Sequence, residues 1–274
     1  MPAAPLLTRS VRDRDGVVRS TVSGAHPRRL AWALLALDFV IVLTSVAVIR
    51  VVAPGTSALT SALIVTAVLA VVVTVLVWRF SGFREAGFTG PRSWRNLHLL
   101  ILPTVLTFIP LLAGFRPVDA LATLIVGYAL TGFMEEALWR GLVLRVLRPT
   151  GPLPAALFGS LLFGAAHLSN VLFRDSVTLV VAQAVGATCF GVGYAAMALR
   201  IGTIWPLMLL HTLTDLFAAV GALPKIPILV GQDIVLLVFG LWLLRGSSQH
   251  ARAHSPREVR EYAAEEISPF RKER

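Results

Sequence analysis

The chain has 274 residues, of which 56% are hydrophobic and only 15% are charged. Soluble domains carry about 25% charged residues, so this composition excludes an ordinary soluble protein and indicates one polytopic membrane domain. The net charge is +10, and the 23 arginines and 2 lysines lie in the tails and between apolar runs. That distribution indicates membrane topology and no nucleic-acid partner.

Eight apolar segments approach the roughly 20 residues that a membrane-spanning helix needs. In chain order they cover residues 30–51, 58–78, 97–113, 120–147, 153–173, 177–199, 203–220 and 226–244. We therefore expect an all-α transmembrane helix bundle over residues 30–245. A polar tail of residues 1–29 precedes it, and a polar tail of residues 246–274, with one helix over 256–267, follows it.

Positive charges divide unevenly between the two sides of this eight-span arrangement. When the segments between successive spans are assigned to alternating sides of the membrane, 21 lysines and arginines fall on the same side as the N-terminus and 4 on the opposite side. The positive-inside rule then places both termini in the cytoplasm of a multi-pass cell-membrane protein. The first apolar run is too long for a signal-peptide core, so we interpret Arg28 and Arg29 as an inside anchor rather than a twin-arginine signal.

Two spans contain residues that shape helices. Pro103 and Pro110 predict that the third span is kinked or broken. Gly186, Gly191 and Gly193 give the sixth span a small-residue surface, which we interpret as a helix-packing surface. The single cysteine, Cys189, excludes a disulfide within the chain and any multi-cysteine metal site.

Two adjacent carboxylates, Glu135 and Glu136, interrupt the apolar fourth span. A charge at mid-membrane costs roughly 2.5–3.5 kcal/mol on insertion scales, and such groups usually face the protein interior and have a function. Glu136 and Arg140 are four residues apart and are expected to pair on one helix face. Glu135 is rotated by about 100° and points elsewhere.

Polar residues also interrupt the fifth and seventh spans, at His167, His211 and Asp215. Helices could bring both imidazoles to the Glu135 carboxylate, which in a dry site can act as a base near neutral pH. Two histidines and one glutamate also form a known catalytic zinc set. The H-E-x-x-H motif is absent, so a metal-free water activated by glutamate stays open. Asp38, in the first span, is interpreted as structural or is left unexplained.

Three motifs in this order resemble those of the CPBP intramembrane proteases, also called CaaX-protease/bacteriocin-processing or Abi proteins. They read Glu135-Glu136-Ala137-Leu138-Trp139-Arg140, Phe163-Gly164-Ala165-Ala166-His167 and His211-Thr212-Leu213-Thr214-Asp215. The resemblance covers about residues 119–218. One departure is Asp215, where many relatives carry asparagine.

The resemblance implies a multi-pass endopeptidase, of a family commonly described as metalloproteases, that cuts membrane-associated proteins or peptides within or near the membrane. On this basis Glu135 is the expected general base, and His167 and His211 bind zinc or, without metal, orient water and stabilise the oxyanion. Asp215 completes that set, while Glu136 with Arg140 holds the helix in register. The arginine-heavy composition suggests a high-GC bacterium, where prenylated substrates are not expected.

Two other functions remain open from the sequence. A non-proteolytic scaffold or bacteriocin-immunity protein of the same fold would keep the spans and tolerate loss of the polar residues. A proton-coupled transporter would also use buried carboxylates and histidines. Transporters usually show two similar halves, whereas each motif here occurs once.

Overall fold

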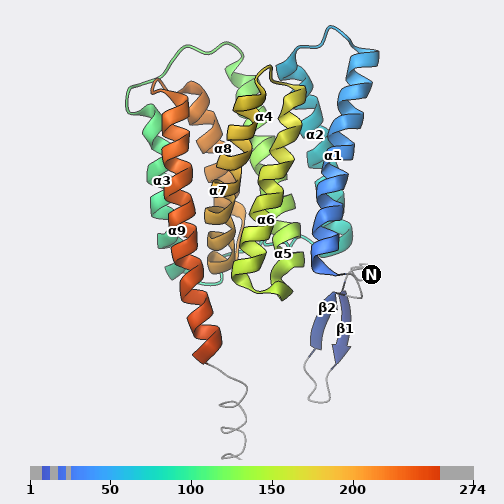
Figure 1. Cartoon of the computed structure of the whole chain (residues 1–274), viewed down its shortest axis with the longest axis vertical. Coiled ribbons are helices and arrows are strands. Elements are labelled where there is room, and N and C mark those ends of the chain that lie inside the picture. Colours follow the sequence, from blue (N-terminus) through green and yellow to red (C-terminus); the bar gives the residue numbers. More distant parts are fainter. Residues whose placement is uncertain (1–7, 13–17, 23–25, 254–274) are drawn as a thin grey trace, which may run out of the picture.

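The computed structural model describes residues 8–12, 18–22 and 26–253, and most of them form a bundle of long helices (Figure 1). A small hairpin precedes the bundle, in which strand β1 (Thr8–Arg12) pairs antiparallel with β2 (Val18–Val22). No strand was predicted in this tail. The helix predicted over 256–267 lies outside the described residues.

The helices of the bundle follow the predicted spans in order, which confirms the all-α transmembrane class. Their bounds are α1 Pro27–Val52; α2 Ala58–Leu76 with η1 Val77–Ser81; η2 Trp94–Leu100, α3 Ile101–Phe108 and η3 Ile109–Leu111; α4 Leu121–Glu135, η4 Glu136–Val143, α5 Leu144–Leu147 and η5 Arg148–Thr150; α6 Pro152–Ala166 with η6 His167–Leu172; α7 Val177–Ile201; α8 Trp205–Val220; and α9 Lys225–Ala253. Within the described residues, seven helical segments are long and apolar enough to cross a membrane, and α8 is a shorter apolar helix.

Two helices differ from simple 20-residue spans. The α-helical part of the third span, α3, has only 8 residues, and 3-10 turns flank it on both sides. Pro103 and Pro110 remove backbone donors there, so the predicted break is confirmed. The last span was predicted to end at 244, whereas α9 runs to Ala253. Hydropathy marks where the apolar segment ends, and a helix can continue beyond that point.

Small residues allow the helices to approach closely. Helix α7 packs between α6 and α9, and a Cβ added at Gly240 would lie 2.8 Å from the Cα of Gly193. A Cβ added at Gly191 would lie 3.0 Å from the Cβ of Ser160. The predicted packing role of the α7 glycines is therefore confirmed.

Helix α4 packs on α8, and this contact positions the polar residues of both. A Cβ added at Gly132 would lie 2.4 Å from Thr212 Oγ1 and 2.8 Å from the Met208 carbonyl oxygen. Only glycine therefore fits without a shift. Gly132 lies one turn before the two glutamates, and Thr212 follows His211, so this close approach brings the two motifs together.

Candidate active site

The two glutamates lie where the helix changes its winding. Glu135 is the last residue of α4, and Glu136 begins η4, a π-helical segment of 8 residues. The backbone N–H of Leu144 donates to the carbonyl of Trp139, five residues earlier. The sequence-based expectations for this span use α-helical spacing, and Glu136–Val143 departs from it in having wider turns. Wide turns of this kind are rare and are frequent at functional sites.

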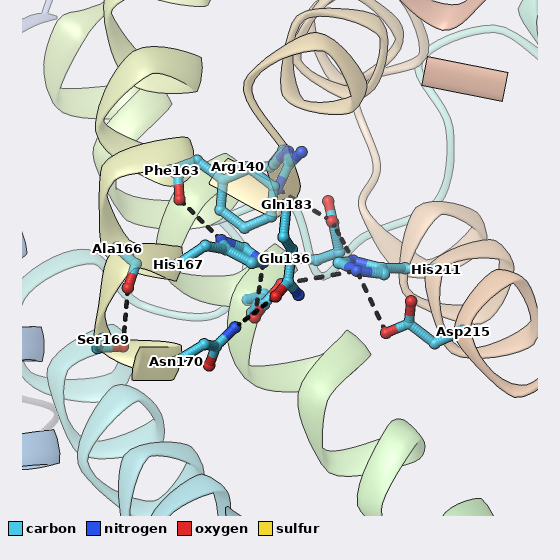
Figure 2. Close-up of polar contacts among 11 residues, drawn as sticks. Glu136, Arg140, Phe163, Ala166, His167, Ser169, Asn170, Gln183, His211 and Asp215 are labelled. Carbon is cyan, nitrogen blue, oxygen red and sulfur yellow. Dashed lines mark hydrogen bonds and ion pairs between the residues drawn. The ribbon is translucent and has the colours of Figure 1, made fainter. Parts of the chain in front are cut away.

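Glu136 points into the closed interior of the bundle. Its Oε1 lies 3.1 Å from Arg140 Nη1 and accepts a hydrogen bond of 2.9 Å from His211 Nδ1 (Figure 2). The Glu136 side chain is 0% exposed and that of Arg140 is 2% exposed. The predicted pair with Arg140 is confirmed. Its bond to His211 was not predicted, because spacing along one helix carries no information about a residue 75 positions away.

Three aromatic rings surround the guanidinium of Arg140. Its Cζ lies 4.5 Å from the ring centroid of Phe163, 5.5 Å from that of Tyr194 and 5.9 Å from that of Phe190. Cation–π contacts stabilise a desolvated arginine by about 2 kcal/mol. We call Glu136, Arg140, Phe163, Phe190 and Tyr194 the sealed side of the site.

Glu135 contacts the two motif histidines. Its Oε2 lies 3.5 Å from His211 Nε2, and its Oε1 lies 4.0 Å from His167 Nε2. Oε2 is buried, with no hydrogen-bond partner among the described residues. The prediction that one carboxylate and two imidazoles from three helices meet is therefore confirmed as geometry.

Each histidine ring is oriented through its Nδ1. His167 Nδ1 donates to the carbonyl of Phe163 over 3.0 Å, and His211 Nδ1 donates to Glu136 (Figure 2). These partners assign the proton to Nδ1 in the neutral rings and leave both Nε2 atoms available. Asp215, predicted to orient or complete the set, lies near the same ring, with its Oδ2 3.8 Å from His211 Nε2.

A cavity of about 100 Å³ adjoins Glu135 and His167. Asp38 of α1 and Asn170 of η6 also line it, and Asn170 Nδ2 donates to Gln183 Oε1 over 3.0 Å. We call Glu135, His167, Asp38 and Asn170 the cavity side. From the sequence, Asp38 is interpreted as structural or is unexplained. A lone carboxylate in an apolar span could have indicated that it faces a polar cavity.

The two imidazoles and the carboxylate are ligand types that zinc prefers. The distances between them agree only in part with those of a zinc site. Ligands about 2.0–2.1 Å from a tetrahedral zinc lie roughly 3.3 Å apart, which is close to the 3.5 Å between Glu135 Oε2 and His211 Nε2. The 4.0 Å between Glu135 and His167 is longer. No group of three His, Cys, Asp or Glu side chains in the described part of the chain is arranged to hold a metal ion. Glu135, His167 and His211 would be the ligands.

A larger cavity, of about 430 Å³, lies elsewhere, between η2, α7 and α9. Its polar and charged lining residues are Asn96, His98, Arg200 and Arg245, with Trp242 beside them. None of the motif residues lines it. Cavity size alone would thus favour this region, whereas the convergence of Glu135 and two imidazoles favours the smaller cavity as the candidate site.

Comparison with known families agrees with this assignment. Residues 117–217 match the family model described as Type II CAAX prenyl endopeptidase Rce1-like. The matched segment contains all six candidate residues, from Glu135 to Asp215, and at the level of the family it indicates a membrane-embedded protease. Searches of curated proteins and of solved structures found no match. The resemblance based on the three motifs is thus confirmed, because residues 117–217 of this chain match the Rce1-like family of type II CAAX prenyl endopeptidases.

Proposed function

We propose that the chain is an intramembrane endopeptidase that hydrolyses peptide bonds of a membrane-associated protein or peptide. One observation carries the proposal: Glu135 lies beside the Nε2 atoms of His167 and His211 at the edge of a cavity. A buried carboxylate next to two imidazoles, with room for a substrate water, is a suitable constellation for hydrolysis.

In the proposed reaction Glu135 takes a proton from a water molecule in the cavity. The water oxygen attacks the carbonyl carbon of the scissile peptide bond and forms a tetrahedral intermediate. Glu135 then passes the proton to the leaving nitrogen as the C–N bond breaks, so that the products are a carboxylate and an amine. A positioned general base of this kind contributes about 10²–10⁴-fold to the rate.

The two histidines have one of two roles beside this base. As neutral rings, they present the Nε2 lone pair, which accepts a hydrogen bond from the attacking water or ligates a metal. As protonated rings, they donate from Nε2 to the oxyanion. If zinc is bound, it supplies Lewis-acid polarisation of the carbonyl and a more acidic water.

The sealed side and Asp215 act on the histidine and do not touch the substrate in this proposal. Glu136 holds His211 through Nδ1, and Arg140 balances the Glu136 charge inside the aromatic rings. Asp215 lies on the Nε2 side of the same imidazole. The site residues support peptide hydrolysis, and the prenyl group in the family's name is not part of the proposal.

The decisive variant is Glu135→Gln, which keeps the shape of the side chain and removes its basicity. We expect new protein N-termini in membranes of a host with the wild-type chain, and their loss with Glu135→Gln at equal membrane levels. Profiling of N-termini by mass spectrometry measures this. If Glu135→Gln is present at wild-type level and the same cleavages and phenotype persist, the chain is a scaffold or immunity protein and the protease proposal is wrong.

The metal requires a separate measurement. Elemental analysis of the purified protein, before and after chelation, compares bound zinc with proteolytic activity. Zinc in a 1:1 ratio that is lost together with activity, and fails to bind to His167→Ala, supports a metalloprotease with the three ligands named above. Full activity of metal-free protein would leave the water activated by Glu135 alone.

A further inference from the structure

The cavity beside Glu135 lies in the half of the bundle away from both ends of the described chain. Helix α1 begins near the hairpin, and α9 ends at the same end of the bundle (Figure 1). The cavity is lined from α2 by Ala62, Val65 and Thr66, which follow the start of that helix at the far end, and from η6 by Ser169 and Asn170, which follow the far end of α6.

Toward the near end, the site is closed by packed side chains. Every residue of η4, from Glu136 to Val143, is buried, and Leu144 and Leu147 of α5 are 1% and 0% exposed. Trp139 lines the cavity and is itself buried, so it forms part of the cavity floor. Water and substrate therefore have no route to Glu135 through this packed segment.

The polar residues of the site are partly exposed. The side chains of Glu135 and His167 are 15% and 13% exposed, and that of Asp215 is 35% exposed. These residues belong to three different helices, so the exposure describes an opening of the site and not the mobility of one side chain. The far-end lining from α2 and η6, together with the packed near end, indicates that the site is reached from the end of the bundle opposite the start of α1 and the end of α9.

The charge distribution indicates which side of the membrane this end faces. Among the described residues, Arg50, Arg116, Arg174 and Lys225 lie in or next to the connections at the far end. The sequence count of 21 to 4 for the eight-span arrangement is the asymmetry expected when the near end is cytoplasmic. The open end of the site then faces the extracytoplasmic side.

We propose that the substrate is a polypeptide segment that reaches the site from the extracytoplasmic half of the bilayer, such as the outer part of a translocated or membrane-inserted chain. This rests on the proposed function. The cavity of about 100 Å³ accommodates about three water molecules, which suffices for the hydrolytic water. The amide group of Asn170 lines it, held by its hydrogen bond to Gln183, and its carbonyl oxygen can accept a hydrogen bond from the backbone of an extended peptide.

Cysteine accessibility tests the direction of opening without any need for catalysis. In a Cys189→Ala background, which removes the only natural cysteine, three single variants are compared: Asn170→Cys in the cavity, Asp175→Cys in the exposed loop beyond it, and Thr150→Cys at the opposite end. A membrane-impermeant maleimide is applied to intact spheroplasts and to inverted vesicles.

We expect labelling of Asp175→Cys and Asn170→Cys in spheroplasts, and of Thr150→Cys only in inverted vesicles. Labelling of Asn170→Cys only in inverted vesicles, or its absence from both preparations while Asp175→Cys reacts, would overturn the proposal. The pattern should be the same with Glu135→Gln added. If cleavage persists in Glu135→Gln but the labelling holds, the protease function fails while the direction of opening stands.

Discussion

The sealed side and the cavity side use adjacent glutamates in opposite ways. Glu136 is 0% exposed, and its Oε1 contacts both Arg140 and His211. Glu135 is 15% exposed, lies next to the cavity, and keeps one oxygen without a hydrogen-bond partner among the described residues. Glu136 Oε2 likewise has no hydrogen-bond partner among the described residues, so the two glutamates differ in their surroundings. An ion-paired carboxylate closed in by packed side chains stabilises the structure, whereas a carboxylate beside a cavity is accessible to water.

Position along the chain is therefore a poor guide to role at this site. The two residues are neighbours, yet the helical twist directs them to different surroundings. His211 joins the two sides, because its Nδ1 binds Glu136 and its Nε2 faces Glu135. Separate variants of the two sides should therefore give separate losses, of stability on one side and of activity on the other.

Arg140→Ala should have the largest effect on stability. It leaves Glu136 buried without its cation, and breaking one partner of a buried pair typically costs about 3–5 kcal/mol. Thermal unfolding in detergent measures the loss. Glu85→Ala is the control: the largely exposed Glu85 pairs with Arg145, and loss of this ion pair should cost less than about 1 kcal/mol. Equal losses of stability in the two variants would contradict the inference that the buried Glu136–Arg140 pair stabilises the fold more than an exposed ion pair does.

His211→Ala and His167→Ala should separate stability from activity. Both should reduce cleavage by about 10²–10⁴-fold if they act with the base. Only His211→Ala also removes a buried hydrogen bond to a charged group, worth about 1.5–3 kcal/mol. Adding Glu135→Gln to either should lower the rate little further, because losses within one catalytic unit are not additive. A multiplicative loss would show that the histidine acts independently.

Gly132→Ala should have a smaller effect that spreads to both sides. Its Cβ would meet Thr212 Oγ1 and the Met208 carbonyl, and overpacking of this kind costs about 1–3 kcal/mol. Since α8 also carries His211, we expect weaker cleavage together with a lower unfolding temperature. Gly127→Ala is the control on the same helix, where the nearest atom is Leu63 Cδ1 at 3.8 Å. It should be neutral or slightly stabilising.

Much of this arrangement could be predicted from the sequence. Apolar length located the helices, since each span must satisfy its own backbone groups in lipid. The i, i+4 spacing predicted the Glu136–Arg140 pair, and the rotation of about 100° separated Glu135 from it. The cost of polar groups in hydrocarbon singled out His167 and His211 and led to their meeting with Glu135.

The rest depended on contacts between helices, which no local pattern encodes. Phe190 resembles any apolar residue of α7, yet its ring lies beside Arg140. Asp38 comes from the first helix and reaches the cavity only because α1 packs next to α2 and α6. The π-helical winding of η4 was missed, because hydrophobic periodicity over eight residues does not distinguish wide turns from α-helical ones.

The wide turns of η4 limit how the chain length can vary here. At its N-terminal end the segment follows Glu135, whose position is set by its contacts with His167 and His211. On the other it leads to Arg145, whose guanidinium donates to Ser81 and to Glu85. Each wide turn takes roughly one residue more than an α-helical turn. Deleting one residue would rotate Arg145 by about 100° relative to Glu135, so this segment should tolerate substitutions better than insertions or deletions.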